Sequence, residues 1–108
     1  MYSQSEVLDA WRKATGTRSD GVLALSLGKA RTALSPYRRG TRVMDDEMGL
    51  LAADATGLDP VLVILSLQGA RAELDGQKRL HKIYADAFFH CSRLGRMALS
   101  MTKAIGEM

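Results

Sequence analysis

DGVLALSLGKARTALSPYRRG, residues 20–40, is the stretch of sequence that decides the fold. A-x-x-x-G at residues 24–28 is followed by L-S-x-Y-x-x-G at residues 34–40, which is the spacing of a helix-turn-helix. Ala24 is small enough for two helices to cross, and Gly28 supplies a turn conformation that other residues adopt poorly. The stretch predicts two helices, over residues 20–27 and 30–39, whose apolar inner faces come from Leu23, Leu27, Leu34 and Tyr37.

The second of these helices presents cationic and small polar side chains outward, which suits the major groove of DNA. The N-terminal residues of such a helix face base edges, so we expect direct base readout by Arg31, Thr32 and Ser35. Cations at the helix ends and in the next loop are suited to hold phosphates, which position a protein without reading sequence. We assign that role to Lys29, Arg38, Arg39 and Arg42.

From Leu23 to Pro60 the sequence resembles the Cro/CI-like (Xre-type) helix-turn-helix regulators of phages and prophages. The resemblance lies in A-x-x-x-G, L-S-x-Y-x-x-G, M-D-D-E and G-L-D-P, and it covers about a third of the chain. It implies an all-α, compact five-helix DNA-binding domain. Two positions depart from the family pattern: Lys29 replaces an apolar turn residue, and Pro36 falls inside the predicted recognition helix. Because proline shortens or bends a helix, either this helix is brief or the register is shifted by a few residues.

The charge is distributed unevenly along the chain, although the total is only +3. Residues 1–44 carry eight Lys/Arg and three Asp/Glu (+5), residues 45–75 one and seven (−6), and residues 76–108 six and two (+4). No acid occurs from Gly21 to Met44, where five cations gather. A polyanionic partner explains this asymmetry, since phosphate contacts supply most non-specific DNA affinity. The alternative is a solvated basic face with no partner.

Capping signals predict the remaining helices of the domain. Ser3 begins a helix over residues 3–14, and Asp45 begins another that Gly57 ends. The acids at residues 45–47 fit the positive end of that helix better than a metal site, because consecutive helical side chains diverge. Asp59-Pro60 opens a fifth helix that is apolar nearly all round and is expected to be buried. The predicted core comprises Trp11, Leu23, Leu27, Leu34, Leu51 and Leu58.

The last segment, residues 76–108, has a different pattern. Apolar residues recur there at alternating steps of four and three, which is a heptad seam. We predict a long helix that pairs with another chain through Leu80, Tyr84, Ala87, Cys91, Leu94, Ala98, Met101 and Ile105. The alternative is a helix that folds back on its own core, because small residues make this seam unlike a strong zipper, and Gly95 could break the helix in two.

The sequence offers little for catalysis or for a membrane. His81 and His90 are nine residues apart, which does not place two metal ligands on one helical face, and we expect neither a metal nor a cofactor. The chain lacks a phosphate-binding glycine loop and a nucleophile elbow, so we do not expect an enzyme. A single cysteine, the absence of a long apolar run and an N-terminus unlike a secretion signal predict a cytoplasmic location.

These observations predict a DNA-binding domain at residues 1–75 and a helical dimerisation segment at residues 76–108. The expected function is sequence-specific binding of a palindromic double-stranded operator by a homodimer, as a phage or prophage repressor. A second hypothesis keeps DNA binding but makes the chain an excisionase, a replication accessory protein or an antitoxin. A third is a protein-interaction module that binds a host protein, which Pro36 favours.

Overall fold

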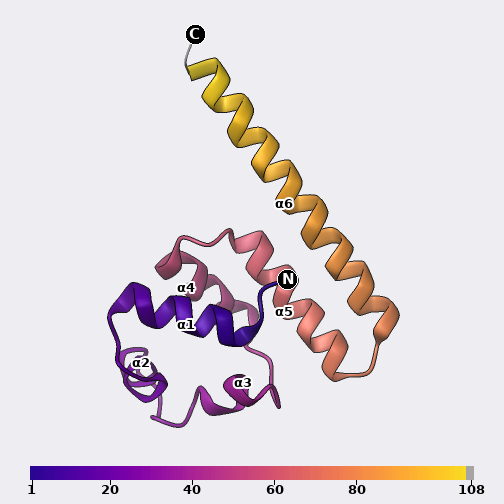
Figure 1. Ribbon diagram of the computed structural model, residues 1–108. Coiled ribbons are helices and arrows are strands. Elements are labelled where there is room, and N and C mark those ends of the chain that lie inside the picture. Colours follow the sequence, from indigo (N-terminus) through magenta and orange to yellow (C-terminus); the bar gives the residue numbers. More distant parts are fainter. Residues whose placement is uncertain (107–108) are drawn as a thin grey trace.

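In the computed structural model, which describes the backbone of residues 1–106 and the side chains of residues 1–94, the chain folds into helices joined by short connections (Figure 1). The part of the chain that is described contains no strand, so the prediction of an all-α protein is confirmed. The helices are α1 (Gln4–Thr15), α2 (Asp20–Ser26), α3 (Ser35–Arg39), α4 (Asp46–Thr56), α5 (Pro60–Leu74) and α6 (Lys78–Gly106).

The predicted capping residues begin the helices as expected. The Ser3 hydroxyl accepts a hydrogen bond from the Glu6 N–H at 3.1 Å, which satisfies one free donor at the start of α1. The Asp45 carboxylate accepts from the Met48 N–H at 2.8 Å, and Asp59 caps α5 in the same way. Asp45 is therefore a helix cap, as the sequence indicates.

The second helix of the predicted helix-turn-helix is shorter than expected. We predicted a helix over residues 30–39, but residues 31–34 form turns and α3 begins only at Ser35. Pro36 lies in the first turn of α3, where its missing N–H would have no intrahelical partner anyway. In a helix that began at residue 30, the proline ring would clash with the Thr32 carbonyl, four residues earlier. Of the two explanations for Pro36, the brief helix is the one observed.

One core joins the first five helices. Trp11, Leu23 and Leu34 are almost fully buried, while Leu27 and Leu58 pack against the core at its edge. Leu51 was predicted to be buried but is 45% exposed, because α4 turns its smaller residues, Ala52 and Ala53, inward. The buried cluster comprises Val7, Leu8, Trp11, Leu23, Ala24, Leu34, Met44, Met48, Ala52, Ala53, Val63 and Leu67.

Helix α5 is central, as its apolar sequence predicts, because it contacts α4 on one side and α6 on the other. Gly49 permits the close approach of α4: a Cβ atom built there would lie 2.6 Å from Cδ1 of Leu67. On the other side, the Gly69 carbonyl lies 2.9 Å from Nδ1 of His81 on α6. The missing side chain of Gly49 thus allows α4 to pack closely on α5, while the contact of His81 with a backbone carbonyl joins α6 to the other side.

Helix α6 folds back along α5 and then continues past it (Figure 1). Its first half packs in the same chain through Phe88, whose ring makes a T-shaped contact with the ring of Tyr2 at a centroid distance of 5.3 Å. The Tyr2 N–H in turn donates to the buried Ser66 hydroxyl on α5 at 3.0 Å. The alternative of a helix folding back on its own core therefore describes the first half of α6. Among residues 1–106, no helix combines the length and the hydropathy needed to cross a bilayer.

Candidate nucleic-acid interface

The candidate DNA-reading residues lie in and just after the turns that precede α3. Arg31 and Thr32 are exposed in these turns, and Ser35 is the half-buried first residue of α3. The prediction that Arg31 and Thr32 belong to a helix is therefore wrong, because Pro36 limits how far the helix can extend towards them. The three residues still follow one another along one short segment, on the side of the molecule away from α6 (Figure 1).

Arg39 and Arg42 follow this segment in the chain, at the end of α3 and in the loop after it. Both are exposed, and Gly40 between them adopts a left-handed conformation (φ 77°) that ends the helix. Among the side chains of residues 1–94, no carboxylate lies within ion-pair distance of Arg31, Arg39 or Arg42. These three guanidinium groups are thus accessible to an external anion.

Arg38 occupies a different environment from Arg39. Its guanidinium donates to both carboxylate oxygens of Asp20, at 3.0 and 2.8 Å, and to Asp9 at 2.9 Å. A further bond reaches the Ser5 carbonyl at 3.3 Å. Arg38 therefore connects α3 to the start of α2 and to α1. The sequence placed Arg38 among the phosphate contacts, but its hydrogen-bond donors are engaged within the chain.

The charges of this cluster stabilise one another. The hydrogen bonds from Arg38 hold the pKa of the Asp20 carboxyl below its ordinary value, and partial burial opposes this only in part. The Asp20 hydrogen bonds in turn raise the pKa of the Arg38 guanidinium. Both side chains are ionised at neutral pH. The charges of Arg38 and Asp20 therefore cancel, and this pair adds no net positive charge to the surface.

Lys29 lies beside acidic residues. It shares a small surface hollow of about 200 Å³ with Asp45 and Glu47, between the end of α2 and the start of α4. Those carboxylates lower the local positive potential, because the potentials of nearby opposite charges partly cancel. Among the four residues predicted to hold phosphates, Arg39 and Arg42 thus retain the most favourable surroundings.

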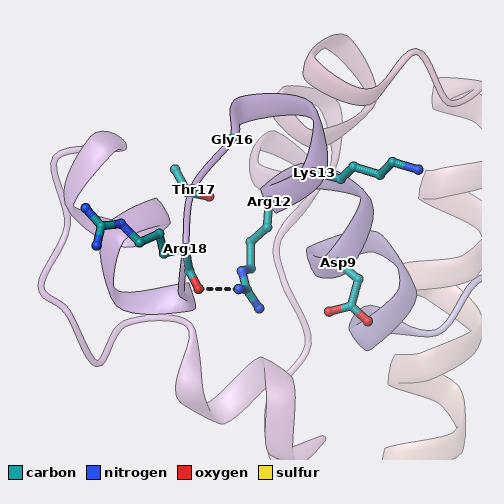
Figure 2. Close-up of a pocket in the computed structure, with 6 residues that line it drawn as sticks. All are labelled: Asp9, Arg12, Lys13, Gly16, Thr17 and Arg18. Carbon is teal, nitrogen blue, oxygen red and sulfur yellow. Dashed lines mark hydrogen bonds between the residues drawn. The ribbon is translucent and has the colours of Figure 1, made fainter.

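A second group of cations, which we did not predict as a site, surrounds a pocket beside α2. The pocket has a volume of about 520 Å³ and is lined by Asp9, Arg12, Lys13, Gly16, Thr17 and Arg18 (Figure 2). Arg12 reaches back to donate to the Arg18 carbonyl, while the side chains of Lys13 and Arg18 point away on opposite sides (Figure 2). Because the side chains of these cations point in different directions, they form a broad basic surface. They do not converge on one ligand-binding point. The net charge of residues 1–44 was the one sequence signal for it.

The residues predicted for dimerisation differ in how exposed they are. Tyr84, Ala87 and Cys91 are partly buried, on the half of α6 that packs on α5, whereas Leu80 and Leu94 are 36% and 51% exposed. Ala98, Met101 and Ile105 lie beyond the side chains that are described. The heptad pattern thus combines residues that pack in the same chain with residues that are free on the surface.

Comparisons of the chain with protein-family models, with curated proteins and with solved structures gave no match. The resemblance to Cro/CI-like regulators therefore rests on the sequence motifs.

Proposed function

We propose that the chain is a sequence-specific double-stranded DNA-binding regulator that works in the cytoplasm, as a phage or prophage repressor. One observation carries the proposal: Arg31 before α3, Arg39 at its end and Arg42 after it are all exposed, and none is paired with an acid among the side chains described. Nearby, Arg38 and Arg71 do form ion pairs with aspartates. The free cations are thus those suited to contact an external polyanion.

The proposed mode of readout follows from the shape of the segment. Arg31 and Thr32 in the turns, with Ser35 at the start of α3, contact base edges, and an arginine can bond twice to a guanine. Arg39 and Arg42, at the end of α3 and in the loop after it, hold phosphates beside this contact, and Lys29 contributes less because of its acidic neighbours. Lys13 and Arg18, which are exposed, add further positive charge for contact with DNA phosphates.

A short reading segment makes few base contacts, so specificity requires two copies. Two half-sites about 34 Å apart, one turn of B-DNA, double the number of base contacts and require a palindromic operator. A dimer bound across a promoter represses by blocking polymerase. The most direct test is DNA binding by Arg31→Glu and Arg39→Glu variants, with Lys82→Glu on the exposed side of α6 as the matched control.

A protein-interaction module is the second candidate, and α3 favours it. Helix α3 has only five residues, which is short for insertion into a major groove. If this candidate is correct, charge reversal at Arg31 and Arg39 leaves the function intact, and the chain binds no DNA at low salt.

A further inference from the structure

An apolar groove on the surface lies between α4 and α5. It has a volume of about 270 Å³ and is lined by Leu50, Pro60, Val61, Ile64 and Leu65, all of them apolar. Leu50 and Val61 are 47% and 54% exposed, although both are large aliphatic side chains. A contiguous exposed apolar patch of this kind marks an interaction surface more often than isolated exposed leucines do.

Among the side chains that the structure describes, none from α6 of the same chain lines this groove. Three residues separate the end of α5 from the start of α6, which runs back along the face of α5 that carries Gly69. With 29 residues against 15, α6 is about 43 Å long and α5 about 22 Å, at about 1.5 Å of rise per residue. The last part of α6 therefore extends beyond the start of α5, as Figure 1 shows. Leu94, near the point where α6 leaves α5, is 51% exposed.

The acidic residues that neighbour the groove in the sequence and the basic residues of the end of α6 have opposite charges. Glu47, Asp54 and Asp59 are exposed on α4 and at the start of α5, within a segment of net charge −6. On α6, no acid occurs between Asp86 and Glu107, and the basic residues of that interval are Arg93, Arg96 and Lys103. At helical spacing Glu47 and Asp54 lie on the same face of α4 as Leu50, and Asp59 directly precedes Pro60, so these acids border the groove. A second copy of the chain thus supplies an amphipathic helix whose basic residues complement these acids.

We propose that the end of α6 from a second copy lies in the groove between α4 and α5, and that the first copy does the same in return. Such an exchange is symmetric, because each chain contributes one groove and one helix end. It differs from the heptad seam between two α6 helices that the sequence predicted, since the partner surface is α4 and α5. This inference is linked to the proposed function at one point: the proposed regulator needs a dimer, because a dimer presents two copies of residues 31–35 to one operator.

Disulfide trapping distinguishes the two interfaces. In a Cys91→Ser background, full-length chains with Val61→Cys are mixed with chains that carry Leu94→Cys, Ala98→Cys or Met101→Cys, and then oxidised mildly. We expect a heterodimeric disulfide from at least one mixture and little homodimer from the helix variants alone. If the helix variants form homodimers and no mixture crosslinks, the seam between α6 helices is correct and the proposal is wrong.

Sedimentation equilibrium gives an independent measure of the same interface. Val61→Glu places a charge in the groove, so we expect the dimer dissociation constant to rise about tenfold or more. Val22→Glu is the matched control, because Val22 is 39% exposed on α2, outside the groove, and its variant should dimerise as the wild type does. A wild-type chain that remains monomeric at all concentrations contradicts the proposal.

Charge exchange tests the complementarity. Asp54→Lys should weaken the dimer. Adding Arg93→Asp and Arg96→Asp to the same chain should restore part of the affinity, because the exchanged charges again attract each other. If the substitutions instead weaken the dimer additively, these charges do not interact across the interface. The outcome is separable from that of the proposed function. A dimer that uses the groove but binds no DNA supports this inference and refutes the regulator, and a DNA-binding monomer does the reverse.

Discussion

Arg38 on α3 donates two hydrogen bonds to the carboxylate of Asp20 on α2, from Nε at 3.0 Å and from Nη2 at 2.8 Å. The same guanidinium donates to Asp9 on α1 at 2.9 Å. These hydrogen bonds hold α3 in place. The helix has only five residues and no fully buried side chain, so it has few packing contacts of its own with the core. The position of α3, and of the segment proposed to read DNA, therefore depends on Arg38.

We predict that Arg38→Ala destabilises the fold by about 1 to 3 kcal/mol, the range for losing hydrogen bonds to charged groups. We expect a value in the lower half of that range. The Arg38 and Asp20 side chains are 29% and 25% exposed, and solvent weakens the interaction between partly exposed charges. Urea denaturation measures the loss. Arg39→Ala is the control, since Arg39 is exposed and should change the free energy of unfolding by less than about 0.5 kcal/mol. Equal effects of the two variants would contradict the role of Arg38.

The stability contributed by Asp20 should depend on pH. Its folded-state pKa is lowered from 3.8, mainly by the Arg38 hydrogen bonds. A lowered pKa gives stability that is fully present above the unfolded value and is lost as the pH falls through the folded value. The difference in unfolding free energy between wild type and Asp20→Asn should thus be constant near neutral pH and shrink below 3.8. A difference that does not change down to strongly acidic pH would show that ionised Asp20 contributes nothing.

Two glycine substitutions should have opposite effects. Gly49→Ala places a Cβ atom 2.6 Å from Cδ1 of Leu67, which is buried and must shift, so we expect a loss of about 1 to 3 kcal/mol. Gly21→Ala in α2 meets its nearest atom at 3.6 Å, an ordinary contact, and should be neutral or stabilise by up to about 1 kcal/mol. Thermal unfolding of both variants checks the prediction. A Gly49→Ala variant as stable as the wild type would mean that α4 and α5 are not closely packed.

Charge reversal should separate the proposed phosphate-binding residues from structural cations. We expect Arg39→Glu and Arg42→Glu to weaken binding to all DNA sequences and to reduce the slope of log affinity against log salt by about 0.9 for each phosphate that is no longer neutralised. The free energy of unfolding should change little, because both side chains are exposed. Fluorescence anisotropy across a salt series measures the slope, with Lys82→Glu as the control. An unchanged slope in both variants would remove these residues from the interface.

Local signals in the sequence identified most helix boundaries. Ser3, Asp45 and Asp59 are caps whose effect is confined to one turn, so their pattern is sufficient to place α1, α4 and α5. Pro36 also acts locally, and its position indicated that α3 could be short. The all-α class and the central position of α5 could thus be predicted without a structure.

Contacts between distant parts of the chain could not be predicted. Arg38 meets partners 18 and 29 residues away, and no local pattern distinguishes it from the neighbouring Arg39. Gln4 likewise bonds to the Arg42 carbonyl at 2.9 Å and to the Met44 N–H at 2.8 Å, which fixes the loop after α3. On α6, the heptad pattern could not tell that Phe88 would pack on Tyr2 in the same chain. Each of these outcomes depends on how the helices are arranged in space.

The measurement that tests the central claim most directly is recovery of DNA by the purified chain from a pool of fragments of its source genome, at two salt concentrations. We predict that a palindromic site is enriched and remains bound at the higher salt, and that Arg31→Glu abolishes the enrichment. Uniform binding that disappears at the higher salt would mean that the basic surface is only an electrostatic contact. Recovery of no fragment at either salt would contradict the claim that this chain is a DNA-binding regulator.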